Sequence, residues 1–331
     1  MAIGARGHLG IKKETTWGQK VAGDNDFFLP FVSESLTTNI EELLSAAQRG
    51  ILDEPKSYQG EKAFAGDVVV EVHPTSIGHL LRSALGAPAA ATPVGTAATA
   101  KQHIFTPMQT SAQEFHADCP LFPYTLEVYR DQGQAFQFLG AVVNNLALNF
   151  SITDKILKAT CGIIAKDLGS VDATGLSLEA TNPFVWENAV IKIGGSQNNN
   201  LESFGLSWEN HCVAKYFLNN SPLAGKIIRD GFRTIPVNFT IDFTDRVEYD
   251  YFIAGTERAF QIKFTGASCE TGYYYTLQID LPLVRYLTWP INISGPGRIT
   301  CAVTGKAKYY ADGYPMKVTL INLKDTAEYA A

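Results

Sequence analysis

Apolar and polar residues alternate with a period of two along most of the chain. The clearest examples are residues 146–152 and 237–244, where every second side chain is apolar. This alternation is typical of antiparallel strands that bury one face and expose the other. Further strands of this kind are expected at residues 68–72, 124–128, 159–165, 189–193, 260–264, 275–281, 299–303 and 317–323. The pattern therefore predicts a mainly β protein.

Two stretches have the features of helices instead. Residues 75–85 begin with Thr75, a good N-cap, place five apolar side chains on one face and end before Gly86. Residues 40–48 carry acidic residues early and are followed by Arg49 and a glycine, which agrees with the end preferences of helices. We expect two short helices, the first of them lying against a sheet.

Two other segments have no continuous period. Residues 87–102 carry almost no charge and no large apolar residue except Val94, so we expect an exposed loop that becomes ordered on a neighbouring molecule. The first forty residues mix turns with Trp17, Phe27 and Phe28, whose side chains are costly to leave in water. An N-terminal arm over residues 1–30 that packs on another surface accounts for both facts.

Short patterns recur in the same order in the two halves of the chain. Residues 68–72, 124–128 and 158–162 are echoed by residues 237–241, 275–279 and 298–302. We interpret these echoes as two tandem copies of one β-rich unit, at residues 30–168 and 184–323, with the first copy alone carrying the 87–102 loop. A turn-rich linker (169–183) joins the copies, and a C-terminal tail (324–331) follows them. The alternative is that β proteins share short apolar patterns by chance.

Composition excludes several classes of protein. The 331 residues are 46% hydrophobic, which excludes disorder throughout the chain. The net charge of −6 and the lack of a long basic run argue against tight nucleic-acid binding. The first ten residues contain no apolar signal region, and no stretch approaches eighteen uninterrupted apolar residues, so we expect neither export nor a membrane span, and folding in a cytoplasm. The charged fraction of 18% is below the roughly 25% usual for soluble domains, which suggests surface reserved for partners.

No candidate catalytic, cofactor-binding or metal site emerges. The five cysteines are odd in number and far apart, so we expect buried free thiols rather than disulfides or zinc ligands. Motifs for phosphate cradling, dinucleotide binding, esterase nucleophiles and zinc proteases are missing. His211 and Cys212 are adjacent, but neighbours on a strand point to opposite faces. Residues 24–26 resemble the start of a calcium loop without its remaining ligands. An enzyme is not expected.

The opening of the chain carries a family resemblance. Residues 10–18 (GIKKETTWG) and 31–36 (FVSESL) resemble the major tail tube proteins of long-tailed, siphovirus-type bacteriophages. The resemblance continues in order through Gly60, Gly66 and the segments at 77–81, 85–86 and 140–146. In the second half it is carried mainly by Gly231, residues 237–243 and residues 281–282.

The resemblance implies a structural virion protein of the phage tail, without cofactors. In that family a β-sandwich or barrel unit with a flanking helix or loop joins five others in a ring-shaped β-barrel, and rings stack into the hollow conduit for genome delivery. Two units per chain would make a homotrimer with pseudo-sixfold symmetry; a homohexamer is the alternative. The implied partners are further copies of the chain and the tape measure, tail terminator and distal tail proteins. Double-stranded DNA would pass through without specific binding.

Candidate contacts between stacked rings come from the arm and from the loop. They are Trp17, Phe27, Phe28, Pro93, Val94 and Thr96. Related alternatives are a tail terminator, a distal tail ring or the inner tube of a contractile injection system. From another class, a carbohydrate-binding β-sandwich would use Tyr273, Tyr274 and Tyr275 as stacking platforms.

Overall fold

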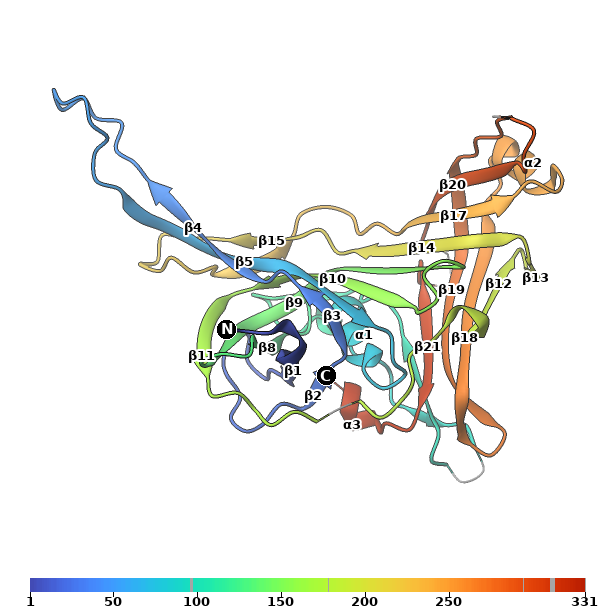
Figure 1. Cartoon of the computed structure of the whole chain (residues 1–331), viewed down its shortest axis with the longest axis horizontal. Helices are drawn as coiled ribbons and strands as arrows, with labels where there is room; N and C mark the ends of the chain where they lie inside the picture. The colour runs from blue at the N-terminus through green and yellow to red at the C-terminus, as the bar shows by residue number, and fades with distance from the viewer. Residues whose placement is uncertain (96–97, 178, 294, 310–312, 331) are drawn as a thin grey trace.

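The computed structural model describes residues 1–95, 98–177, 179–293, 295–309 and 313–330. Its strands form extended antiparallel sheets, from which a long hairpin projects at one end of the molecule (Figure 1). The strands expected from period-two alternation are all present, so the prediction of a mainly β chain is confirmed.

The first half of the chain contributes a series of strands and one helix. In chain order these are β3 (Phe31–Glu34), β4 (Thr37–Leu43), β5 (Tyr58–Glu71), α1 (Ile77–Leu85), β8 (Tyr124–Tyr129), β9 (Ala135–Ser151), β10 (Lys158–Ala165) and β11 (Asp167–Val171). β5 pairs with β10, β10 with β9, and β9 with both β8 and β11.

The second half contributes a series with the same order of pairings. In chain order it comprises β14 (Leu201–Glu209), β17 (Pro236–Asp242), α2 (Val247–Ala254), β18 (Arg258–Glu270), β19 (Tyr273–Thr288), β20 (Thr300–Ala307) and β21 (Lys317–Asn322). β17 pairs with β20, β20 with β19, and β19 with both β18 and β21. In the first series α1 follows β5, which pairs with β10. In the second series α2 follows β17, which pairs with β20.

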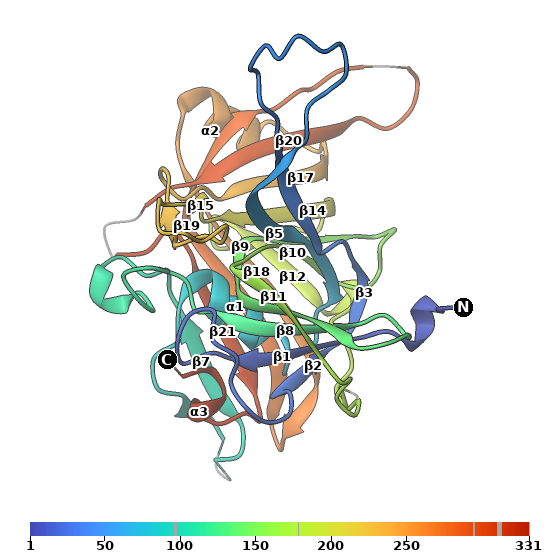
Figure 2. The ribbon, with the colours of Figure 1, turned by 90° about the vertical axis from the view of Figure 1, so that its left-hand side faces the viewer.

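One long strand in each series belongs to two sheets. The first part of β9 lies between β8 and β11, whereas its residues 142–151 pair with β10 and with β14. In the same way, the first part of β19 lies between β18 and β21, and its residues 284–288 pair with β20. Each series therefore folds as two sheets that share one long strand; Figure 2 views these strands from the end that carries the projecting hairpin.

The main sheet runs through both series and buries one of its faces. β14 pairs with β9 on one side and β17 on the other, so the strand order is β5-β10-β9-β14-β17-β20. On the buried face, Val68, Cys161, Leu146 and Trp208 are neighbours across four successive strands, and each is at most 3% exposed. Because strand residues alternate between faces, the intervening side chains form the opposite, open face.

The N-terminal residues provide strands as well as loops. β1 (His8–Lys13) pairs with β8 along its whole length, and β2 (Phe27–Leu29) pairs with β1. Leu9 and Ile11 on β1 are buried. Part of the segment that we expected to form an arm is thus a core strand of the first series.

The insertion after α1 crosses to the second series. β7 (Lys101–Phe105) pairs with β21, and the two-residue β6 (Thr92–Pro93) pairs with β7. The remaining elements are η1 (Gly4–Arg6), η2 (Ser111–Gln113), η3 (Trp186–Asn188), β12 (Ala189–Ile193), β13 (Ser196–Gln197), β15 (Cys212–Lys215), β16 (Lys226–Arg229) and α3 (Thr326–Tyr329). β12 extends the second series beside β18, whereas β15 and β16 form a separate hairpin.

One of the two helix predictions is correct. α1 matches the expected helix at residues 75–85, and all of its residues are buried. The helix expected at residues 40–48 is wrong, because residues 37–43 form β4, which pairs with β5 in the projecting hairpin. The acidic start and the glycine after Arg49 suit a helix end, but the backbone hydrogen bonds of the β5 ladder decide the conformation here.

The three pairs of sequence echoes do not all fall on corresponding strands. Residues 68–72 and 237–241 lie on or at the end of β5 and on β17, which have the same place in their series. Residues 158–162 lie on β10 and residues 298–302 reach β20, its counterpart. Residues 124–128 and 275–279, however, form parts of β8 and β19, which occupy different places.

Candidate assembly surfaces

The joint between the two series is built from backbone pairing and from side chains. β14 runs antiparallel to β9 over seven paired positions, from Ser203 beside Ser151 to Glu209 beside Asn145. At the end of β14, Trp208 Nε1 donates a hydrogen bond to the Ala84 carbonyl oxygen at 3.2 Å. Asn210 Nδ2 donates to the same oxygen at 2.9 Å. The last turn of α1 is therefore covered by the second series.

The hairpin of β15 and β16 continues this cover over the first series. Cys212 and Ile227 are buried in one cluster with Met108, Leu121 and Phe122. The Ile227 amide donates to the Asp118 carbonyl oxygen at 2.8 Å, and Lys226 Nζ lies 2.8 Å from an Asp118 carboxylate oxygen. β14 and the hairpin of β15 and β16 thus both pack against the first series.

The main sheet ends in exposed strand edges. Among the described residues, the side of β3 and β4 that faces away from β5 pairs with no strand. At the other end of the same sheet, residues 285–288 of β19 pair with β20 on one side and, in the described chain, with no strand on the other. Unpaired edges present rows of backbone donors and acceptors to another chain.

The open face of the main sheet is lined largely by small, uncharged side chains. Its central positions are Asn145, Ala147, Asn149, Thr160, Ser203, Ser207, Asn238, Thr240, Ala302 and Thr304, which are neighbours across β10, β9, β14, β17 and β20. Toward its borders lie the acidic residues Asp67, Glu71, Glu209 and Asp242 and the basic residues Lys158, Arg285 and Lys306. This face therefore carries charges of both signs at its borders and none at its central positions.

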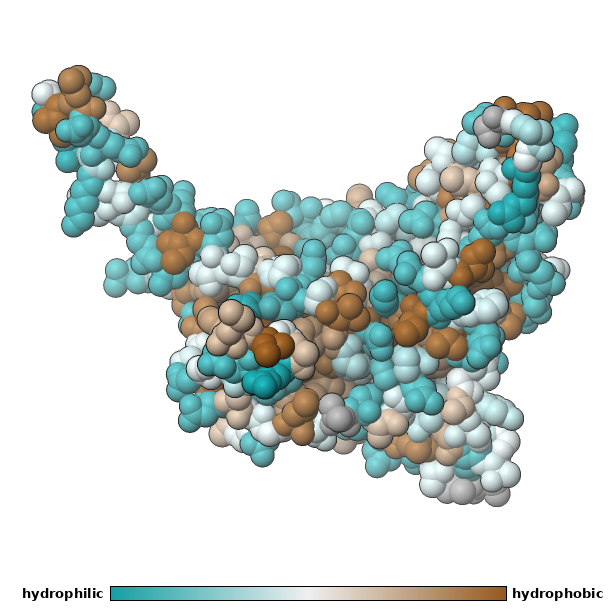
Figure 3. Space-filling view, in the orientation of Figure 1, coloured by the Kyte–Doolittle hydropathy of each residue, from teal (hydrophilic) through white to brown (hydrophobic). Residues whose placement is uncertain are grey.

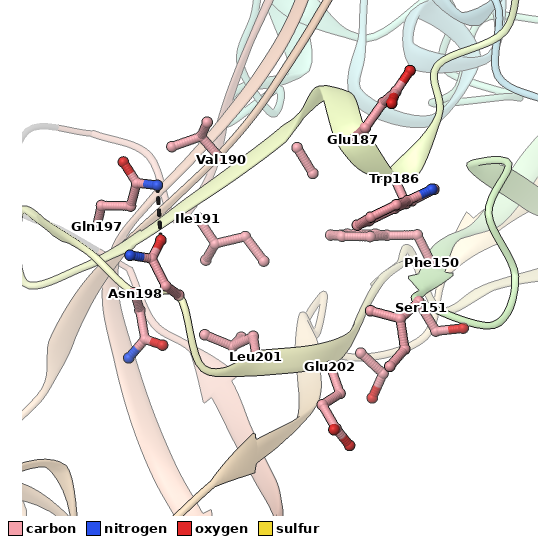
Figure 4. A pocket seen from close by; sticks show the side chains of 14 residues that line it. Phe150, Ser151, Trp186, Glu187, Val190, Ile191, Gln197, Asn198, Leu201 and Glu202 are labelled. Atoms are coloured by element: carbon pink, nitrogen blue, oxygen red, sulfur yellow. Dashed lines mark hydrogen bonds between the residues drawn. The ribbon is translucent and has the colours of Figure 1, made fainter. Parts of the chain in front are cut away.

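A cavity of about 360 Å³ opens where β9 ends beside β12–β14 (Figure 4). The ring of Trp186, which is 46% exposed, lies against Phe150, and Asn198 and Gln197 form the opposite end (Figure 4). Among its described lining residues the titratable groups are two carboxylates, of which Glu202 pairs with Arg298 at 2.6 Å. This lining offers no nucleophile with a neighbouring base.

Three of the predicted contact residues lie on or near the first two strands. Trp17 is 6% exposed, donates from Nε1 to the Gly140 carbonyl oxygen at 3.1 Å and lies under the Lys166 ammonium. Phe28 is also buried, whereas Phe27 is half-buried against His79. Because Trp17 and Phe28 pack inside the single chain, they present little surface to a neighbouring ring.

The other predicted contacts lie in the 87–102 loop. Pro93 is exposed and Val94 is half-buried, while Thr96 lies outside the described residues. Glu270 of β18 accepts hydrogen bonds from the backbone amides of Thr99 and Ala100, at 3.1 and 2.8 Å. The base of the loop is therefore fixed to the second series within the chain.

The C-terminal helix docks beside α1 through a buried polar network. The Tyr329 hydroxyl donates to the Thr75 carbonyl oxygen at 2.6 Å and accepts from Asn322 Nδ2 at 3.0 Å. His79 Nε2 lies 3.1 Å from Glu328 Oε1, and this hydrogen bond holds the pKa of Glu328 down at about 2. Burial lowers the pKa of His79, so His79 is neutral and donates to the ionised carboxylate.

The cysteines behave as packing residues. Cys119, Cys161, Cys212 and Cys301 are buried and Cys269 is partly exposed; all five are free. Burial raises the pKa of Cys212 to about 11, so its thiol is protonated and unreactive at neutral pH. In the described chain no cluster of three or more His, Cys, Asp or Glu side chains could hold a metal ion. No described helix is both long and apolar enough to cross a membrane.

Of the tyrosines considered as sugar platforms, Tyr274 is exposed. Tyr275 is only partly exposed and packs against the core. These residues therefore do not form a row of exposed rings on one face.

The described residues thus form a mainly β protein with long antiparallel strands and open sheet edges. The sequence matches the phage tail tube protein family over residues 4–307, so the chain belongs to that family. It is a structural protein of the virion tail. No curated protein matches the chain. The residues around Trp17 indicate this family from the sequence. The β9–β14 joint and the projecting hairpin could not be predicted, because no local sequence pattern indicates them.

Proposed function

We propose that three copies of this chain form a ring with pseudo-sixfold symmetry, and that such rings stack into the tail tube through which the genome is delivered. The observation that carries the proposal is the joint between β9 and β14. It joins two series with the same pairing order, and the sheet on either side of it ends in strand edges that pair with no other described strand. If chains repeat that joint, the edge formed by β3 and β4 of one chain meets the edge of β19 in the next, and the sheet closes on itself.

The number of units in the proposed ring follows from two tandem units in each chain. We propose units at residues 30–168 and 184–323 joined by a linker at 169–183, supported by the first series from β3 to β11 and the second from β14 to β21, although β11 extends to Val171 and β1 adds residues 8–13 to the first series. Three chains would then supply six units. A hexamer of the chain would contain twelve units and would need a much wider barrel than the six-unit family ring.

The open face of the main sheet is the proposed wall of the channel. Its central side chains are amides, hydroxyls and methyl groups, and its charged residues, of both signs, lie only at its borders. Phosphate groups are held by clustered Lys and Arg, so a wall with few of them allows DNA to slide without capture.

Stacking of rings remains assigned to the loop that bears Pro93 and Val94 and to the N-terminal segment. Pro93 is exposed at the edge of a two-residue strand, and Phe27 is half-buried against His79 of α1. Further tail proteins, namely the tape measure, tail terminator and distal tail proteins, would meet the channel and the two ends of the tube.

Negative-stain electron microscopy of the purified chain tests this function. Hollow tubes built from many stacked rings are expected, and they separate a tail tube from a terminator or a distal tail ring, which form single rings. Persistent monomers at high protein concentration would contradict the proposal.

A further inference from the structure

The two helices that follow β5 and β17 differ in how they are covered. α1 has one apolar face, and all of its residues are buried. α2 has apolar residues on all sides, yet none of its residues is fully buried. Val247 is 57% exposed and Ile253 is 66% exposed. The outer side of α2 therefore carries two exposed apolar side chains on either side of Asp250, which pairs with Arg246 at 3.0 Å, and these apolar side chains lack a cover in the single chain.

The inner side of α2 is firmly held. Glu248 pairs with Arg258 at 2.7 Å and accepts a hydrogen bond from the Tyr286 hydroxyl at 2.8 Å. The Arg258 guanidinium also lies over the Tyr251 ring, 4.0 Å from its centre. The exposure of Ile253 is thus a property of a fixed helix and not of a loosely attached one.

The cover of α1 shows what α2 lacks. Trp208 and Asn210 bond the Ala84 carbonyl oxygen from the end of β14, and the hairpin of β15 and β16 buries Cys212 and Ile227 next to the segment that follows α1. α1 and the segment after it are thus covered by β14 and by the hairpin of β15 and β16, which follows β14 in the chain.

The first series has the corresponding strand and hairpin. β3 pairs with residues 68–70 of β5, as β14 pairs with β17. Between β3 and this part of β5 the chain forms the hairpin of β4 and residues 58–65, as the chain between β14 and β17 forms the hairpin of β15 and β16. The projecting hairpin therefore has the place in the first series that the covering hairpin has in the second.

The projecting hairpin carries exposed apolar side chains along its length. They are Ile40, Leu43, Leu44, Ile51, Leu52 and Tyr58, each at least 45% exposed, and Leu52 is fully exposed. Apolar residues also gather at the outer end of the projection (Figure 3). Within one chain the hairpin and α2 lie at opposite ends of the molecule (Figure 1), so neither can cover the other.

We propose that the β4–β5 hairpin of one chain lies over α2 of the adjacent chain in the same ring. This inference rests on the proposed ring, in which the joint between β9 and β14 is repeated between chains. The occupant of the α2 surface is thus a second copy of this chain, and the apolar side chains around Leu43 meet those around Ile253. The hairpin fastens neighbouring chains within a ring, in addition to the pairing of strand edges.

Cysteine cross-linking of assembled tubes tests the contact. Leu43→Cys and Ile253→Cys are combined in a Cys269→Ser chain, because Cys269 is the partly exposed thiol of the native sequence. A short bismaleimide should then link chains covalently into dimers and closed trimers on a denaturing gel. The matched control combines Ile253→Cys with Leu218→Cys, a fully exposed position in the turn between β15 and β16, and should give no linked chains.

The possible outcomes separate this inference from the proposed function. Tubes that form normally but remain uncross-linked with Leu43→Cys, or that cross-link equally well in the control, would overturn the hairpin contact and leave the tube function standing. Failure of the unmodified chain to form any ring would overturn the proposed function itself.

A second variant avoids dependence on the cross-linker. Val247→Ser combined with Ile253→Ser removes exposed apolar groups from α2, so the monomer should fold with an unchanged melting temperature. The protein concentration needed for half of the chains to enter rings should rise at least about tenfold. Leu176→Ser, which removes a similarly exposed side chain from the linker, is the control and should not change it. An unchanged ring-forming concentration for the α2 variant would contradict the inference.

Discussion

Trp208 and Ala84 link the two halves of the chain: the indole Nε1 donates to the Ala84 carbonyl oxygen at 3.2 Å, and the Trp208 side chain is 1% exposed. The acceptor belongs to the last turn of α1, whose carbonyl groups have no partner within the helix. A side chain from β14 therefore satisfies a helix end of the first series and fills the space beside it.

Removing this side chain should weaken the whole chain. Trp208→Ala should lower the free energy of unfolding by about 3–5 kcal/mol, because a large buried ring is lost and the Ala84 oxygen loses a donor. Trp208→Phe should cost less, since most of the packing remains. Urea denaturation followed by circular dichroism measures both effects.

Trp186→Ala is the matched control, because that ring is 46% exposed beside the cavity. Its effect on the free energy of unfolding should be much smaller than that of Trp208→Ala. Equal effects of the two alanine variants would mean that the joint contributes little to stability.

Most of the regular strands could be predicted from the sequence, because period-two alternation records burial on one face. α2 was missed because the apolar residues of VEYDYFIA are spread around the helix and alternate with two acidic residues, so they form no single apolar face. β4 was mistaken for a helix because acidic residues precede Arg49 in a short apolar stretch. The joint depends on residues such as Asn145 and Glu209, which are far apart in sequence, so no local pattern could identify it.

The open face should tolerate neutral substitutions and resist basic ones. Ser207→Lys, Asn238→Lys and Thr304→Lys together should leave tube formation intact, because these side chains point away from the core. Genome ejection from phage carrying this variant should be slower, and the delay should shrink as the salt concentration rises.

The same three positions changed to glutamine provide the control for side-chain size. Ejection at the normal rate from the lysine variant, with tubes of normal structure, would show that this face does not line the channel.

Acid should loosen the attachment of the C-terminal helix. The pKa of Glu328 is about 2 in the folded chain against an ordinary 4.5, so its contribution to stability is present above pH 4.5 and is lost as the pH falls toward 2. Burial holds the pKa of His79 below its ordinary 6.5, so the unfolded chain gains a proton below pH 6.5 that the folded chain excludes. Both effects lower stability on acidification.

The melting temperature of the chain should therefore fall between pH 7 and pH 5 because of His79, and fall further below pH 4.5 because of Glu328. His79→Gln keeps a hydrogen-bond donor near Glu328 and should reduce the steepness of that fall. Part of the fall in melting temperature should remain in this variant, because burial also lowers the pKa of His103 next to Tyr329. An identical pH dependence in the variant would exclude His79 as a source.

The loop assigned to stacking can be tested without unfolding it. Pro93→Gly combined with Val94→Ser removes the two apolar side chains assigned to stacking and leaves the hydrogen bonds from Thr99 and Ala100 to Glu270 in place. Rings should form normally, but tubes seen by electron microscopy should be shorter. Thr92→Ser in the same strand is the control, and tubes of normal length from the double variant would remove Pro93 and Val94 from the stacking contact.

The number of chains in one ring tests the central claim most directly. Native mass spectrometry of single rings, or the symmetry of tubes in electron cryomicroscopy, should give three chains of 36.1 kDa per ring, with six similar units around the channel. Six chains per ring would contradict the account, because the β9–β14 joint would then not serve as the repeating contact of a six-unit barrel.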